Sequence, residues 1–114
     1  MSFPQRGEVY WVKLDPTIGS EIAKTRPAVI ISNNVGNQHA DRVIVAPISA
    51  GGVLKLYPYE VKIEDVEGGL GQTSKVLLDQ IRTVDKTRLG NRIGALTSKQ
   101  MEAINRAIGL SLAV

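Results

Sequence analysis

The sequence contains no cysteine, one histidine and few aromatic residues. Without cysteine, the chain forms no disulfide, no thiolate zinc site and no cysteine nucleophile. The single histidine, His39, excludes a two-histidine acid–base pair and a multi-histidine metal cage within one chain. One Trp, three Tyr and one Phe argue against a broad aromatic platform for stacking nucleic-acid bases.

Long hydrophobic stretches are also missing. The longest aliphatic run, Ala28 to Ile31, is too short to span a bilayer, and residues 1–6 lack the apolar core of a secretion signal. We therefore expect a cytoplasmic protein with no membrane partner.

What is present is the composition of an ordinary globular protein, with 43% hydrophobic and 22% charged residues. A length of 114 residues predicts one domain spanning residues 1–114. Fourteen Lys and Arg against eleven Asp and Glu give a formal net charge of +3, which tolerates a polyanionic partner without demonstrating one.

Short segments rich in β-formers dominate the chain up to Leu96. The apolar run after Arg26 predicts a strand buried on both faces, with Pro27 among its first residues or at an edge. Gly51-Gly52 predicts a tight hairpin turn, and Gly68–Gly71 predicts a loop. The predicted strands are Val9–Leu14, Arg26–Ile31, Arg42–Ile48, the alternating segment 57–63, Val76–Val84 and Ile93–Leu96.

The helical signal is confined to the end of the chain. Thr97 and Gln100 have the spacing of a capping box. Gly109 is compatible with either a cap or a bend. The apolar stripe that follows the capping box consists of Met101, Ile104, Ala107 and Ile108. Strands closed by one helix predict a β-rich α+β domain, built as a small twisted barrel.

Motifs for cofactor or metal chemistry are missing. Gly68–Gly71 precedes a strand and not a helix, so it is no phosphate-binding loop, and there is no nucleophile elbow. His39 lies among polar residues, which favours a solvated loop over a catalytic role. Glu64, Asp65 and Glu67 flank turn glycines and are typical of a solvated surface. We expect no metal and no cofactor.

Polar residues nevertheless gather at the predicted strand ends. Ser20 and Glu21 occupy the first long loop, Arg26 begins a strand, and Ser49 ends another. Taken singly, each has a structural explanation: loop polarity for Ser20, an ion pair between Glu21 and Arg26, and a turn cap for Ser49. These explanations are favoured until the order of the segments is considered.

That order resembles the MazF/PemK family of toxin endoribonucleases. The resemblance covers essentially the whole chain, and several blocks in sequence are more specific than any one alone. It implies a barrel related to SH3 folds, a homodimer, metal-independent cleavage of single-stranded RNA, and a cognate MazE-like antitoxin. The blocks are Arg6–Trp11, Leu14–Pro16 with Gly19–Glu21, Thr25–Ile31, Val45–Ser49, Leu78–Asp85 and the terminal helix.

By this resemblance, Arg26 matches the family's catalytic arginine, and Ser49 matches a position usually held by a catalytic threonine. Ser20 stands where one branch carries a histidine, and Leu77 replaces an arginine of that branch, which places the chain nearer the arginine–threonine type. The resemblance implies RNA contacts by Ser20, Glu21, Asp79 and Gln80.

The chemistry follows from the substrate. In metal-free cleavage the neighbouring 2′-hydroxyl of RNA is the nucleophile, and a guanidinium such as that of Arg26 is suited to the charge developing on the phosphoryl oxygens. The general base is unassigned, with Glu21 a candidate only if its loop brings it close. The alternatives are a binding toxin of the CcdB type, which traps DNA gyrase, and a non-catalytic SH3-like module.

Overall fold

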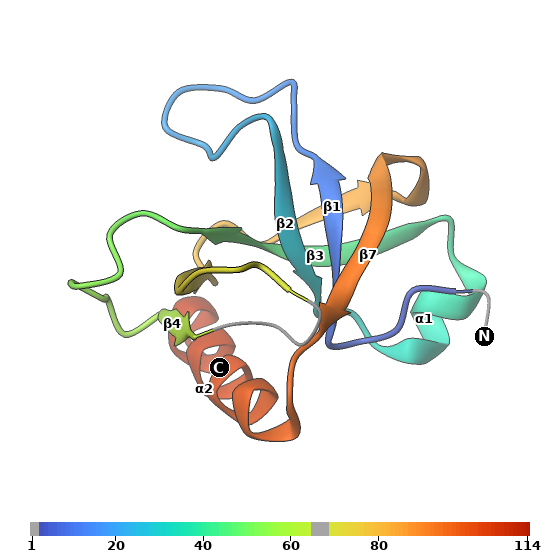
Figure 1. Ribbon diagram of the computed structural model, residues 1–114. Coiled ribbons are helices and arrows are strands. Elements are labelled where there is room, and N and C mark those ends of the chain that lie inside the picture. The colour runs from blue at the N-terminus through green and yellow to red at the C-terminus, as the bar shows by residue number, and fades with distance from the viewer. Residues whose placement is uncertain (1–2, 65–68) are drawn as a thin grey trace.

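The computed structural model describes residues 3–64 and 69–114 (Figure 1). Its strands are all paired antiparallel. In chain order the elements are β1 (Glu8–Lys13), β2 (Thr25–Ile30), α1 (Asn34–His39), β3 (Arg42–Ser49), β4 (Glu60–Ile63), β5 (Ser74–Leu77), β6 (Arg82–Asp85), a 3₁₀ turn (Lys86–Arg88), β7 (Leu89–Ala95) and α2 (Ser98–Leu112).

The sheet follows the order β4-β5-β3-β2-β1-β7, and β6 pairs with β3 beyond that path. Strand β3 is the centre of the fold because it pairs with β2, β5 and β6. Figure 1 shows the strands twisted steeply across one another, with α2 packed below β4. The expectation of a β-rich α+β fold, a twisted barrel-like sheet with a C-terminal helix, is confirmed.

The inner strands are buried on both faces and so contribute to two hydrophobic clusters. In β2, Val29 joins the cluster beneath α2, whereas Ala28 and Ile30 join the second cluster on the other face. All three are fully buried. This explains why the sequence here is continuously apolar instead of alternating. Pro27 precedes the β2–β3 pairing, which begins at Ala28, so its missing N–H costs no bond to β3.

Helix α2 begins as the sequence predicts. The Thr97 hydroxyl accepts a hydrogen bond from the Gln100 amide, and the Gln100 side chain accepts one from the Thr97 amide, which completes the capping box. Gly109 neither caps nor ends the helix, which runs to Leu112 and closes with Ala113 in the left-handed region. Of the predicted stripe, Ile104 and Ala107 are buried, while Met101 and Ile108 pack half-buried against the core.

Several sequence-based boundaries are wrong. Residues 76–84 do not form one strand: β5 ends at Leu77, a turn follows, and β6 begins at Arg82. Only Glu60–Ile63 of the segment 57–63 is a strand, and β7 begins earlier than predicted, at Leu89. Gly51-Gly52 is no tight hairpin, because residues 50–59 separate β3 from β4 and β5 lies between these strands in the sheet.

A second helix was not predicted. Helix α1 is capped by Asn33, whose side chain accepts a hydrogen bond from the Gly36 amide. Asn37 is fully buried and donates to the Ser32 carbonyl at 2.9 Å, so polar contacts hold the helix in place of an apolar stripe. His39 is its last residue and is exposed, so it is solvated as expected, although it lies in a helix and not in a loop.

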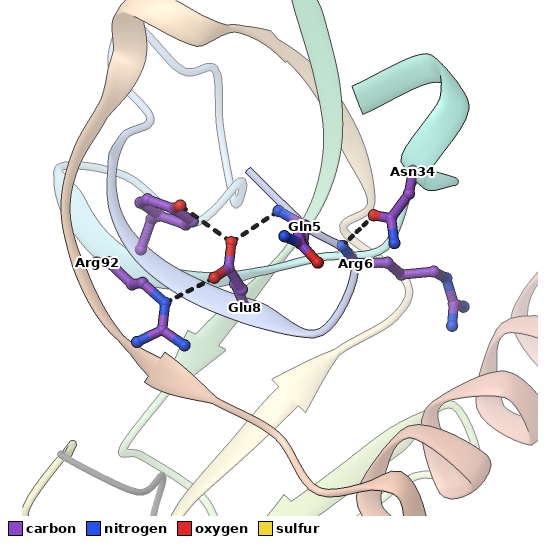
Figure 2. A network of polar contacts seen from close by, with 6 residues as sticks. Gln5, Arg6, Glu8, Asn34 and Arg92 are labelled. Carbon is purple, nitrogen blue, oxygen red and sulfur yellow. Dashed lines mark hydrogen bonds and ion pairs between the residues drawn. The ribbon is translucent and has the colours of Figure 1, made fainter. Parts of the chain in front are cut away.

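A polar network fastens the N-terminal segment to the sheet and to α1, where Asn34 Oδ1 accepts a hydrogen bond from the Arg6 amide at 2.7 Å (Figure 2). The Glu8 carboxylate accepts hydrogen bonds from the Gln5 amide at 2.7 Å, the Tyr10 hydroxyl at 3.1 Å and Arg92 Nε at 2.7 Å. Burial raises the pKa of Glu8, but these donors outweigh it, so the pKa lies below its ordinary value of 4.5. The network therefore holds Glu8 in its ionised form.

Candidate active site

Four of the predicted site residues line one groove. It is an open depression of about 480 Å³, and we call it the polar groove; its lining is Ser20, Glu21, Ile22, Asp79, Gln80, Ile81 and Arg82. The first three residues come from the loop between β1 and β2, and the rest come from the turn between β5 and β6 and the start of β6. The Gln80 side chain joins the two segments by accepting a hydrogen bond from the Ile22 amide at 2.7 Å.

The loop that carries Ser20 and Glu21 is closed at its base. The Leu14 amide donates to the Lys24 carbonyl at 2.9 Å, and Arg82 Nη1 donates to the Leu14 carbonyl at 2.9 Å. Glu21 Oε1 accepts a hydrogen bond from the Ile18 amide at 2.5 Å. Ser20 and Glu21 are both exposed. The β1–β2 loop is therefore held by hydrogen bonds where it joins the strands, while Ser20 and Glu21 remain exposed at the polar groove.

Arg26 stands half-buried near the start of β2. Its Nε donates to the Ala23 carbonyl at 3.1 Å, which orients the guanidinium. In the described part of the chain Arg26 forms no ion pair, so the predicted bridge to Glu21 is absent. Among residues 3–64 and 69–114 its positive charge therefore has no carboxylate partner.

Arg26 lines a second pocket, of about 390 Å³. Trp11, which pairs with Pro27 across the β1–β2 ladder and is 44% exposed, forms one wall of it. The remaining lining is Lys24, Thr25, Pro27, Ile48, Ala50, Gly69, Leu70, Gln72 and Ser74. The pocket combines cationic side chains with an aromatic surface.

Ser49 ends β3, where its Oγ accepts a hydrogen bond from the Gly51 amide at 3.2 Å. The β2–β3 pairing ends at Ala28 and Pro47, two residues short of Arg26 on β2 and of Ser49 on β3, and Ser49 itself pairs with Lys75 of β5. Ser49 itself does not line the pocket of Arg26, although its neighbours on both sides do.

The structure therefore gathers the predicted RNA-contacting residues in one groove and sets the predicted catalytic pair at adjacent strand ends. Sequence reasoning missed Arg82 and Trp11 as lining residues. Arg82 stood within a block already singled out for the resemblance. Trp11 gave a signal as a large aromatic residue in a short strand, directly across from the strand that carries Arg26.

Across residues 3–64 and 69–114, no three His, Asp or Glu side chains gather closely enough to hold a metal ion. Of the acidic residues near the turn glycines, Glu64 is exposed and accepts from the Thr73 hydroxyl at 3.1 Å, whereas Asp65 and Glu67 lie outside the described residues. Within these ranges no helix has the length and apolarity needed to cross a membrane.

Residues 5–112 match the family described as the PemK-like, MazF-like toxin of type II toxin–antitoxin systems. The chain belongs to this family. This MazF-like toxin is 43% identical over 108 residues to the endoribonuclease MazF of Staphylococcus saprophyticus, covering 95% of this chain and 90% of the relative. It is 38% identical over 110 residues to endoribonuclease EndoA of Bacillus subtilis, covering 96% and 95% of the two chains.

Solved structures agree with this assignment. A mycobacterial endoribonuclease, determined in complex with its cognate antitoxin, superposes on the MazF-like toxin with a TM-score of 0.78 at 28% identity. The match covers 97% of this chain and 96% of the other. The sequence-based resemblance and the fold expected from it are therefore confirmed.

Proposed function

We propose that this MazF-like toxin is an endoribonuclease that cleaves single-stranded mRNA at specific sequences without a metal ion, leaving 2′,3′-cyclic phosphate and 5′-hydroxyl ends. The observation that carries the proposal is the guanidinium of Arg26, which is oriented by the Ala23 carbonyl and has no ion pair among the described residues, at a strand end next to the strand end that holds Ser49. Two named relatives at 43% and 38% identity are endoribonucleases, which supports the same activity here.

In this mechanism the 2′-hydroxyl of the substrate loses its proton as its oxygen bonds to the adjacent phosphorus, and the bond from phosphorus to the 5′-oxygen breaks, that oxygen taking up a proton to become the 5′-hydroxyl. Arg26 stabilises the negative charge that develops on the phosphoryl oxygens, since a planar, permanently charged fork contacts two oxygens at once. Ser49 orients the phosphate or the 2′-hydroxyl through its Oγ. The guanidinium supplies the charge stabilisation that a metal ion provides in other nucleases.

Sequence recognition is assigned to the polar groove. Proteins read RNA sequence mainly from unpaired bases, whose edges carry donors and acceptors. Carboxylate, amide and hydroxyl groups from Ser20, Glu21, Asp79 and Gln80 offer both kinds of partner within one depression. The loop between β1 and β2 and the loop after Ser49 form the walls along which the RNA strand lies.

The assembly and the cellular setting belong to the same proposal. We propose one toxin domain over residues 1–114, a homodimer, and neutralisation by a cognate MazE-like antitoxin. The antitoxin complex of the mycobacterial endoribonuclease supports the last point. A substrate of cellular mRNA places the protein in the cytoplasm.

The test is cleavage of an unstructured RNA in excess EDTA, with sequencing of the new ends. Arg26→Ala should lower the rate about 100- to 1,000-fold, the range for loss of one transition-state charge stabiliser. Ser49→Ala should lower the rate at least about 10-fold, while Ser49→Thr keeps the hydroxyl and retains activity. Arg106→Ala, which removes an exposed arginine of α2, is the charge-matched control and should cleave normally.

Each outcome bears on a separate part of the proposal. Full cleavage by Arg26→Ala would remove Arg26 from the mechanism. Loss of cleavage in EDTA, restored by a divalent ion, would refute metal independence. RNA left intact by the pure wild-type protein, together with inhibition of DNA gyrase, would favour the CcdB-like alternative.

A further inference from the structure

Two tyrosines form an exposed aromatic stack in the turn that precedes β4. The rings of Tyr57 and Tyr59 have centroids 5.5 Å apart and planes inclined by only 2°. Tyr57 is 52% exposed, whereas Tyr59 is half-buried. The pair therefore exposes aromatic surface to solvent, most of it from Tyr57, and nothing in the mechanism above uses it.

This turn is held in a fixed conformation. Glu60 Oε1 accepts hydrogen bonds from the Tyr57 amide and from Lys75 Nζ, both at 3.1 Å, and the Glu60 amide donates to the Tyr57 carbonyl at 2.9 Å. The side chains of Lys75 and Glu60 are only 13% and 7% exposed. A surface already ordered in this way loses little conformational entropy when a planar ligand stacks on it.

The stack adjoins the polar groove. The Leu78 amide donates to the Tyr59 carbonyl at 3.2 Å, and the next residue, Asp79, lines the groove. Partial burial and then the Asp79 carboxylate raise the pKa of the Tyr59 phenol. The tyrosines therefore stand at the end of the groove that Asp79 lines.

We propose that the Tyr57–Tyr59 stack is a subsite for one unpaired RNA base that flanks the nucleotides read in the polar groove, an inference that rests on the proposed endoribonuclease function. Every base has a π face, so such a stack binds with little sequence preference and complements the hydrogen-bonding groove. Two rings suit a single base, consistent with a sequence too poor in aromatics for a broad platform.

The experiment uses an RNA oligonucleotide of the cleaved sequence, with a 2′-deoxynucleotide at the scissile position to remove the nucleophile and 2-aminopurine at successive flanking positions. Wild type and Tyr57→Phe should bind it equally and quench the fluorescence at one flanking position. Tyr57→Ala should lose that quenching and bind about 5- to 100-fold more weakly, the range for loss of one base–aromatic stack. Val35→Ala, an exposed apolar residue of α1, is the control and should match wild type.

Three results would refute either the tyrosine subsite or the proposed endoribonuclease function, and each would show which of the two has failed. A Tyr57→Ala dissociation constant within twofold of wild type, or unchanged quenching, refutes the subsite while wild-type cleavage leaves the endoribonuclease proposal intact. Normal RNA binding by Tyr57→Ala with weakened inhibition by the antitoxin would assign the surface to a peptide and also refute the subsite. Failure of wild type to cleave any RNA would instead refute the proposed function.

Discussion

Replacing Glu8 by Gln tests whether the network of Figure 2 stabilises the fold through charge. The carboxylate accepts three hydrogen bonds, one of them from the Arg92 cation, and its side chain is only 19% exposed. A glutamine keeps one acceptor oxygen and loses the charge. Hydrogen bonds to charged groups contribute about 1.5–3 kcal/mol each, so we expect Glu8→Gln to lower the free energy of unfolding by about 1–3 kcal/mol at pH 7.

The pH dependence gives the sharper test. Because the pKa of Glu8 lies lower in the folded than in the unfolded chain, its stabilising effect is present above about 4.5 and is lost as the pH falls through the folded value. The difference between wild type and Glu8→Gln should therefore stay constant from about pH 7 to about pH 5 and shrink as the pH falls below about 4.5. Urea unfolding at each pH, at one fixed protein concentration, measures this difference in the free energy of unfolding.

Glu64→Gln is the matched control, since the Glu64 side chain is 78% exposed, pairs with Lys62 at 3.6 Å and accepts one hydrogen bond from the Thr73 hydroxyl at 3.1 Å. Exposed contacts of this kind contribute little, so this variant should unfold like wild type. A Glu8→Gln effect that stays constant as the pH falls from about 5 to about 3, or an equal loss in Glu64→Gln, would refute the reasoning.

The remaining predictions concern packing and loop geometry. Ile104→Ala should lower the free energy of unfolding by about 2–5 kcal/mol in urea titrations, whereas Leu110→Ala, on the exposed side of the same helix, should change it by less than about 0.5 kcal/mol. Thr97→Ala removes the helix cap and should lower the free energy of unfolding by about 0.5–2 kcal/mol in the same assay. Thr97→Ser keeps a capping hydroxyl and should unfold like wild type. Gln80→Ala frees the Ile22 amide, whose hydrogen exchange should accelerate about 3- to 10-fold; unchanged exchange would mean that the bond does not hold the loop.

Sequence patterns predicted the elements whose signals are local. The capping box at Thr97 and the apolar run after Pro27 each depend on neighbouring residues, and both are found in the structure. The turn at Asp79 was missed because the residues around it are as apolar as a strand, and only pairing of both β5 and β6 with β3 reveals the break. Helix α1 was missed because the buried amide of Asn37 anchors it in place of apolar residues.

The candidate site, like the fold, could be predicted from the sequence only in part. The resemblance selected Ser20, Glu21, Asp79 and Gln80 as separate positions, but their meeting in one groove depends on tertiary contacts that no local pattern encodes, such as the bond from the Ile22 amide to Gln80. That Arg26 has no ion pair among the described residues was not predictable either. An ion pair with Glu21 was a reasonable expectation from their spacing, and the loop conformation instead directs that carboxylate to the Ile18 amide.

The two halves of the proposed site are attached to parts of the fold that tolerate change differently. Arg26 lies on a strand whose following residues, Ala28 to Ile30, are fully buried, so packing of the core fixes its position. The polar groove is built from an exposed loop and a turn. Under the proposed function, substitutions in those surface segments should change which bases are accepted while leaving Arg26 and the cleavage step unaltered.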